Sequence, residues 1–140
     1  MSNVVSLKDL SSWAFAHKDA FEYGDVVAVN GHMGYGKTTL IRHLIKAYGS
    51  ELEATSPTFA LMDVHKIGNE HVILHIDAYR LKDENEVFGL GLDMYHPSKT
   101  LIFIEWPQNI PDYILKPNKV IEIAPSNEDD ARSIHYFSVC

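Results

Sequence analysis

Two short runs of apolar residues are the clearest pattern in this sequence. Residues 26–29 read VVAV and residues 101–104 read LIFI, without the alternating polar positions of a strand that faces water on one side. Continuous apolar runs of this length are typical of parallel strands that are buried on both faces. The pattern therefore predicts two central strands of an α/β sheet.

Helical spacing of apolar residues predicts a helix on each side of the first strand. Residues 7–18 carry an apolar stripe after Ser6 and Asp9, which resemble a capping box. Residues 40–45 carry a second stripe, and Gly49 marks where that helix is expected to end. The first half of the chain thus reads as helix, strand, loop and helix.

The remaining elements are predicted from turns and caps. Residues 58–65 and 71–76 read as a hairpin around Gly68 and Asn69, and Asp83 is expected to cap a short helix that ends near Leu90. Residues 120–123 and 134–137 read as a terminal hairpin. Because no repeat, low-complexity tract or linker interrupts the pattern, we expect one α/β domain over residues 1–140, with a central mixed sheet flanked by helices.

Charge and composition indicate which kinds of molecule this chain is expected to bind. The chain has 12 basic and 19 acidic residues and a net charge of −7, which disfavours tight binding to RNA by the chain alone. The only cysteine is Cys140, so no intrachain disulfide can form. No leader-like segment or apolar run of about 20 residues is seen. We therefore expect a cytoplasmic protein that does not bind membranes.

The loop after the first predicted strand carries the strongest chemical signal. Its sequence, GHMGYGKT at residues 31–38, satisfies the pattern G-x-x-x-x-G-K-[ST] of phosphate-binding loops. Glycines let successive amides turn toward a phosphate, a lysine can reach the β- and γ-phosphates, and the hydroxyl after it can bind Mg²⁺. An accidental glycine-rich turn is the alternative, but the flanking strand and helix are the context that a P-loop NTPase-like fold requires. The expected contacts to nucleotide come from Gly31, His32, Met33, Gly34, Tyr35, Gly36, Lys37, Thr38 and Thr39.

Two acidic residues are candidates for the metal and the attacking water. Asp77 ends the segment VILHID, and Glu105 ends LIFIE, so both lie where strands of an α/β sheet present ligands. A helix cap or a solvated strand end is the alternative for each. Alternation also places His71 and His75 on the strand face of Asp77. A His-x-Asp metal pair is conceivable there, but structural histidines are the favoured interpretation.

The sequence favours ATP over GTP by elimination. Asn118 and Lys119 begin like the guanine-reading motif N-K-x-D, but Ile121 stands where the motif requires a carboxylate. The chain also contains no D-x-x-G segment of the kind that GTPases use as a switch.

With these residues in view, the sequence resembles the TsaE (YjeE) family of small P-loop ATPases from bacterial tRNA threonylcarbamoyladenosine modification. The resemblance spans most of the chain. It rests on motifs in the family's order and approximate spacing, namely GHMGYGKTT at 31–39, SPTF at 56–59, HIDAYRL at 75–81, LGL at 90–92 and IEWP at 104–107.

The resemblance implies slow hydrolysis of ATP with Mg²⁺ in support of an assembly that contains TsaD and TsaB, with tRNA contacted only through that assembly. It assigns catalytic roles to Lys37, Thr58 and Glu105, and metal binding to Thr38, Asp77 and Glu105. Arg80 and Trp106 match neighbouring motif residues and are expected at the nucleotide. His32 and Tyr35 depart from the family's usual loop residues, which leaves the kinetics of nucleotide exchange open.

Two other functions remain as alternatives. A small-molecule kinase would share the loop but would need an acceptor pocket and an arginine-bearing lid, and the chain has only Arg42, Arg80 and Arg132. A binding module that responds to ATP without hydrolysing it is the second alternative.

Overall fold

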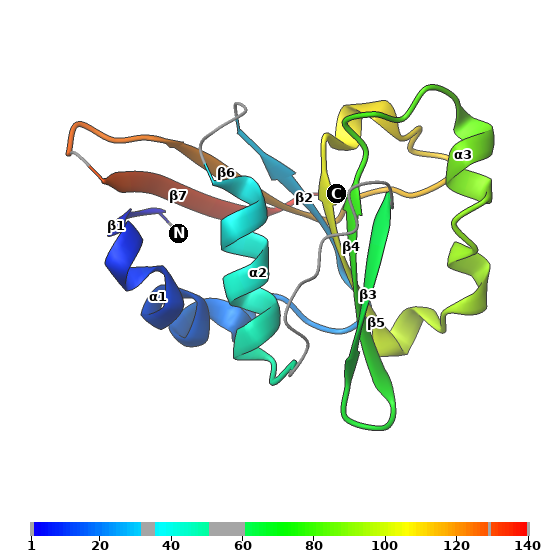
Figure 1. Cartoon of the computed structure of the whole chain (residues 1–140), viewed down its shortest axis with the longest axis horizontal. Coiled ribbons are helices and arrows are strands. Elements are labelled where there is room, and N and C mark those ends of the chain that lie inside the picture. The colour runs from blue at the N-terminus through cyan, green and yellow to red at the C-terminus, as the bar shows by residue number, and fades with distance from the viewer. Residues whose placement is uncertain (1, 32–35, 51–60, 129, 140) are drawn as a thin grey trace.

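The computed structural model describes residues 2–31, 36–50, 61–128 and 130–139. One seven-stranded mixed sheet runs through these residues in the order β1-β7-β6-β2-β5-β4-β3 (Figure 1). The central neighbours β6-β2-β5-β4 pair in parallel, whereas the pairs toward each edge are antiparallel. The expected α/β fold with a mixed sheet is therefore confirmed. The strands are β1 (Ser2–Ser6), β2 (Val26–Asn30), β3 (Met62–Ile67), β4 (His71–Asp77), β5 (Thr100–Glu105), β6 (Lys119–Pro125) and β7 (Ala131–Ser138).

The two apolar runs form the centre of the sheet. Residues 26–29 lie in β2 and residues 101–104 in β5, and the two strands pair in parallel with Val27 opposite Phe103. Val27, Val29, Leu101 and Phe103 are fully buried. Burial on both faces is why neither run alternates with polar residues.

Helices cover both faces of the sheet. The helices α1 (Leu10–His17) and α2 (Lys37–Ala47) pack on one face, and α3 (Glu84–Phe88) lies on the other (Figure 1). Successive strand residues point to opposite faces. Leu101 and Phe103 accordingly join the core under α1 and α2, while Ile104 joins the core beside α3. By the same alternation, Glu105 belongs to the face that α2 covers.

The N-terminal segment differs from the prediction. Residues 2–6 form β1, which pairs with β7, and a 3-10 turn at Leu7–Asp9 precedes α1. The Ser6 hydroxyl donates to the Asp9 carboxylate at 2.8 Å and caps no helical amide. The capping-box interpretation was therefore wrong, because the Ser6 backbone belongs to the edge strand and its partner on β7 lies more than a hundred residues away.

The other local predictions agree more closely. The β3-β4 hairpin turns at Gly68 as expected, although β3 spans Met62–Ile67, further along the chain than predicted, and residues 58–60 lie outside the described residues. Asp83 caps α3 by accepting from the amides of Asn85 and Glu86. The terminal hairpin is confirmed as β6 and β7. None of the helices in the described ranges is long and apolar enough to cross a membrane.

Candidate functional site

The residues singled out from the sequence meet at the carboxyl edge of the central strands. Asp77 is the last residue of β4 and Glu105 the last of β5, and the parallel register places them directly opposite each other. Val29, near the end of β2, is paired with Glu105 on its other side. The chain leaves β2 through Gly31 and enters α2 at Lys37, so the loop and both carboxylates share one edge.

Glu105 is buried at the centre of this site. Its side chain is 5% exposed, and its two oxygens accept from the Thr38 hydroxyl at 2.8 and 2.9 Å. His75 Nε2 lies 2.6 Å from Oε2. Burial acts to raise the pKa of Glu105, but the hydrogen bond and charge of His75, with the Thr38 hydrogen bond and the Lys37 charge, hold that pKa below its ordinary value. The side chain is thus a carboxylate at neutral pH.

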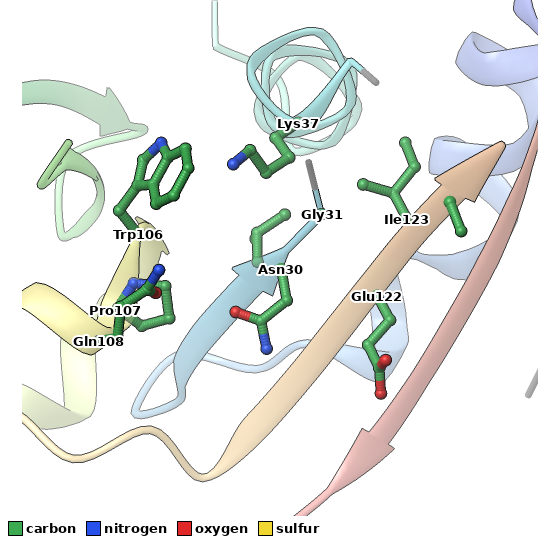
Figure 2. A pocket seen from close by; sticks show the side chains of 10 residues that line it. Asn30, Gly31, Lys37, Trp106, Pro107, Gln108, Glu122 and Ile123 are labelled. Carbon is green, nitrogen blue, oxygen red and sulfur yellow. The ribbon is translucent and has the colours of Figure 1, made fainter. Parts of the chain in front are cut away.

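Lys37 is held between aromatic and acidic groups. Its ammonium nitrogen lies 4.0 Å from the centroid of the Trp106 ring, within the range of a cation–π interaction, and Figure 2 shows the side chain extending from the start of α2 toward that indole. Burial lowers the pKa of Lys37, while the carboxylates of Glu105 and Asp77 act in the opposite direction. Trp106 itself has a left-handed backbone, with φ of 59°, which turns the chain out of the sheet directly after Glu105.

A cavity of about 380 Å³ opens where these groups converge. It is lined by Gly36, Lys37, Thr38, Thr39, Asp77, Glu105 and Trp106. Asp77 is exposed, and one of its oxygens accepts from the amide of Tyr79 at 3.1 Å. A hydroxyl and two carboxylates are the oxygen donors that Mg²⁺ prefers, and this ion usually takes its remaining ligands from water and substrate phosphates. Among the described residues, no group of three or more His, Cys, Asp or Glu side chains could hold a metal ion.

A second cavity, of about 420 Å³, adjoins the first on the β6 side. Lys37 and Trp106 line both cavities, and the second is completed by Val29, Asn30, Gly31, Pro107, Gln108, Glu122, Ile123 and Ala124 (Figure 2). At Gly31 the backbone passes so close to β6 that a Cβ atom would lie 2.6 Å from the carbonyl oxygen of Ile123. The first glycine of the loop is therefore required by packing against β6.

Not every expected residue can be placed in the site. The loop residues His32, Met33, Gly34 and Tyr35, together with Thr58, lie outside the described residues. Arg80 is described and exposed, and it lines neither cavity.

His75 is a further residue of the site, to which the sequence interpretation gave no catalytic role. Alternation placed it on the same strand face as Asp77, and a structural role was favoured for it. Its side chain is 7% exposed and contacts Glu105 directly, from the neighbouring strand. One feature of the sequence could have revealed this contact. The segments that end in Asp77 and Glu105 were both expected to be strands of one sheet, and parallel pairing of their ends brings His75 close to Glu105.

Asn118 and Lys119 lie far from the nucleotide loop. Both side chains bind the Asp25 carboxylate, Asn118 Nδ2 at 2.9 Å and Lys119 Nζ at 2.6 Å, and Asn118 Oδ1 also accepts from the amide of Val26 at 2.7 Å. These contacts are at the start of β2, whereas the loop follows its end. The pair therefore joins β2 to β6, a structural role that agrees with the absence of a carboxylate at Ile121.

One protein family matches this chain over most of its length. The family model described as "Threonylcarbamoyl adenosine biosynthesis protein TsaE" matches residues 4–134. The chain belongs to the TsaE family.

Individual relatives of the family match over most of their length. The chain is 33% identical to the tRNA threonylcarbamoyladenosine biosynthesis protein TsaE of Rickettsia typhi, over 84% of this chain and 81% of that protein. It is 32% identical to the protein of the same name from Bacillus subtilis, over 83% of this chain and 71% of that protein. The crystal structure of Bacillus subtilis YdiB has the same fold, with a TM-score of 0.73 at 22% identity, covering 100% of this chain and 86% of that one.

Proposed function

We propose that this chain binds ATP and Mg²⁺ at its phosphate-binding loop and hydrolyses ATP slowly, as an accessory component of the assembly that makes threonylcarbamoyladenosine on tRNA. The observation that carries the proposal is the single cavity lined by Lys37, Thr38, Asp77 and Glu105. A cation, a hydroxyl and two carboxylates at a helix N-terminus are the groups that phosphoryl transfer to water requires.

Each residue has a chemical role in this proposal. Lys37 binds the β- and γ-phosphate oxygens, and Thr38 and Asp77 supply oxygen ligands to the metal, with Glu105 beside them. When bound, Mg²⁺ neutralises charge on the phosphates. Glu105 orients the attacking water and accepts its proton, and Thr58 of the SPTF segment acts as a switch-like threonine.

Slow turnover by the chain alone follows from the scarcity of arginine. A second cation near the γ-phosphate can accelerate hydrolysis by several orders of magnitude. The chain has only Arg42, Arg80 and Arg132, and the described cavity at Glu105 is lined by none of them. We propose that partner proteins accelerate or harness the reaction.

The proposed partners are TsaD and TsaB. Relatives of this chain carry names that place them in tRNA threonylcarbamoyladenosine biosynthesis. In this proposal, TsaD is the component that transfers the threonylcarbamoyl group. The net charge of −7 favours binding to proteins over direct binding to tRNA, whose phosphates are also negative. Within a cytoplasmic assembly, this chain would drive or reset TsaD and TsaB while tRNA is held by them.

The deciding experiment measures nucleotide binding and turnover in parallel. Calorimetry with ATP and Mg²⁺ should give saturable binding to the parent chain, and Lys37→Ala should weaken that binding at least about 10-fold because the main cation over the β- and γ-oxygens is lost. Phosphate release should be slow for the chain alone and should change when TsaD and TsaB are added. Co-purification with those two proteins, with and without ATP, tests the partners themselves.

The same measurements separate the alternatives. Rapid turnover that ignores TsaD and TsaB would oppose the accessory role. Transfer of labelled phosphate to a metabolite would identify a small-molecule kinase. An equal response of the partners to ATP and to a non-hydrolysable analogue would identify a binding module in which hydrolysis plays no part.

A further inference from the structure

Glu105 contacts His75, the first residue of the HIDAYRL segment, to which the family resemblance assigns no role. His75 and Glu105 are both almost fully buried, at 7% and 5% side-chain exposure, and their atoms Nε2 and Oε2 lie 2.6 Å apart. The two residues stand on adjacent parallel strands, with Phe103 opposite His75 and Glu105 two residues further along β5. Strand alternation directs both side chains to the face that α2 covers.

The direction of this hydrogen bond follows from the charge on Glu105. An ionised carboxylate can only accept, so His75 must carry a proton on Nε2. The same oxygen, Oε2, also accepts from Thr38 at 2.9 Å, whereas Oε1 accepts from Thr38 alone among the described residues. Two donors from different elements thus fix the rotation of the carboxylate, and Oε1 keeps a lone pair for another donor.

We propose that His75 is a positioning residue that holds Glu105 so that Oε1 faces the attacking water. This inference rests on the proposed hydrolysis of ATP. The Thr38 hydroxyl has one proton, which it shares between Oε1 and Oε2, so this contact by itself does not distinguish the two oxygens. His75 contacts Oε2 alone, so it supplies the contact that leaves Oε1 for the water and keeps the buried carboxylate oriented. Outer groups that orient a catalytic side chain in this way typically affect activity by 10- to 100-fold.

The test compares two substitutions that differ in the donor. His75→Leu fills a similar volume without an N–H group, and it should lower kcat for ATP hydrolysis by about 10- to 100-fold while the Kd of Mg-ATP changes by less than about 3-fold. His75→Gln places an amide N–H group near the position of Nε2 and should restore kcat to within about 3-fold of the parent. A purely structural histidine would not produce this split between turnover and binding, or this rescue.

His65→Leu is the matched control. His65 is also buried, at 5% exposure, and it lies on β3 opposite Ile73 of the same strand as His75. Removing it deletes a buried imidazole from the same face of the sheet without removing a donor to Glu105. Its kcat should stay within about 3-fold of the parent even if its thermal stability falls as far as that of His75→Leu.

A spectroscopic measurement tests the contact without turnover. A ¹⁵N–¹H correlation spectrum of the nucleotide-free protein should show His75 protonated on Nε2, assigned by the loss of that signal in His75→Gln. A His75 proton on Nδ1 alone, a parent-like kcat in His75→Leu, or a His75→Gln variant as slow as His75→Leu would each overturn the inference and leave the proposed function standing. A parent chain that hydrolyses no ATP, alone or with TsaD and TsaB, would remove both.

Discussion

At the scale of single residues, Glu105 combines burial with a full charge. Its carboxylate is 5% exposed and receives hydrogen bonds from Thr38 and His75, so its charge is stabilised by oriented donors in place of water. A buried carboxylate whose donors are already in place needs little reorganisation when a water must be aligned. This is the property that the proposed role requires of it.

The first prediction tests that role by removing the charge of Glu105. Glu105→Gln keeps the size of the side chain but offers one accepting oxygen in place of two, so ATP binding should be retained while hydrolysis falls by about 100-fold. Calorimetry and phosphate release measure the two effects. The exposed Glu70, in the turn between β3 and β4 and outside both cavities, provides the control, because Glu70→Gln should change neither quantity.

The same measurements on an Asp77 variant distinguish the roles of the two carboxylates. Asp77→Asn should weaken the dependence of ATP binding on Mg²⁺, since Asp77 is assigned to the metal. If Glu105→Gln abolishes binding of Mg-ATP and Asp77→Asn slows only hydrolysis, the two roles have been exchanged. If neither variant affects hydrolysis, the proposed active site is wrong.

The second prediction concerns Gly31, where backbone and neighbouring strand nearly touch. In Gly31→Ala the new Cβ would lie 2.6 Å from the carbonyl oxygen and 2.7 Å from Cγ2 of Ile123. The strands must separate to admit it, so the free energy of unfolding should fall by about 1–3 kcal/mol. Urea denaturation measures the change.

Gly89→Ala is the control for that substitution. A Cβ at Gly89 would be 3.4 Å from its nearest neighbour, and the φ of −67° suits any residue, so stability should change by less than about 0.5 kcal/mol. Equal effects of the two substitutions would show that the close approach at Gly31 has no energetic importance.

At the scale of elements, β2 is held at both ends by different chemistry. Its carboxyl end carries the loop and packs closely on β6 through Gly31. Its amino end is joined to β6 by Asp25, Asn118 and Lys119, whose side chains form a connected polar cluster. The cluster fixes where β2 begins relative to β6, and therefore where Gly31 at the other end of β2 lies relative to β6.

The third prediction separates this structural cluster from the nucleotide site. Asn118→Ala removes the hydrogen bonds to Asp25 and to the Val26 amide, and it should lower the free energy of unfolding by about 1–2 kcal/mol. The affinity for Mg-ATP should remain that of the parent, because the cluster lies at the opposite end of β2. Denaturation and calorimetry on the same preparation measure both.

Asn127→Ala is the matched control for the cluster. Asn127 is an exposed asparagine in the turn between β6 and β7, so its removal should leave stability within about 0.5 kcal/mol of the parent. If Asn118→Ala loses ATP affinity while its stability is unchanged, Asn118 contributes to the nucleotide site and its structural assignment is wrong.

At the scale of the whole molecule, buried ionisable groups make stability depend on pH. Burial lowers the pKa of His65 from its ordinary 6.5, with Asp63 acting in the opposite direction. The pKa values of Glu105 and Asp25 are lowered from 4.5 and 3.8, because hydrogen bonds and nearby cations outweigh their burial. In each case the unfolded chain takes up protons at a higher pH than the folded chain does.

The fourth prediction is a loss of stability on acidification in two stages. The folded state should lose stability first as the pH falls below 6.5, where histidines such as His65 protonate in the unfolded chain, and again below 4.5 and 3.8, where Glu105 and Asp25 do. Urea denaturation between pH 8 and about pH 3 measures it.

Two variants help to assign the stages. His65→Gln should reduce the first stage but not remove it, because burial also lowers the pKa values of His17 and His43. Glu105→Gln should reduce the part of the second stage that begins at 4.5. A parent chain whose stability is constant from pH 8 to about pH 4 would contradict the burial of these groups.

The sequence by itself determined the local features of this protein. The central strands can be predicted because burial on both faces removes polar residues from them. The Asp83 cap can be predicted because its hydrogen-bond partners are only two and three residues away. The loop with Lys37 and Thr38 is readable for a similar reason, since the motif and its strand-helix context are contiguous. Asp77 and Glu105 can be placed at strand ends because each directly follows the last apolar residue of a strand.

Only the tertiary structure decided which distant residues meet. His75 and Glu105 are 30 residues apart, and Asn118 and Asp25 are 93 apart, so their contacts depend on the order and register of the strands. A shift of one residue in register would turn His75 to the other face of the sheet. Edge strand β1 escaped prediction for the same reason, because the backbone hydrogen bonds that define it come from β7 at the far end of the chain.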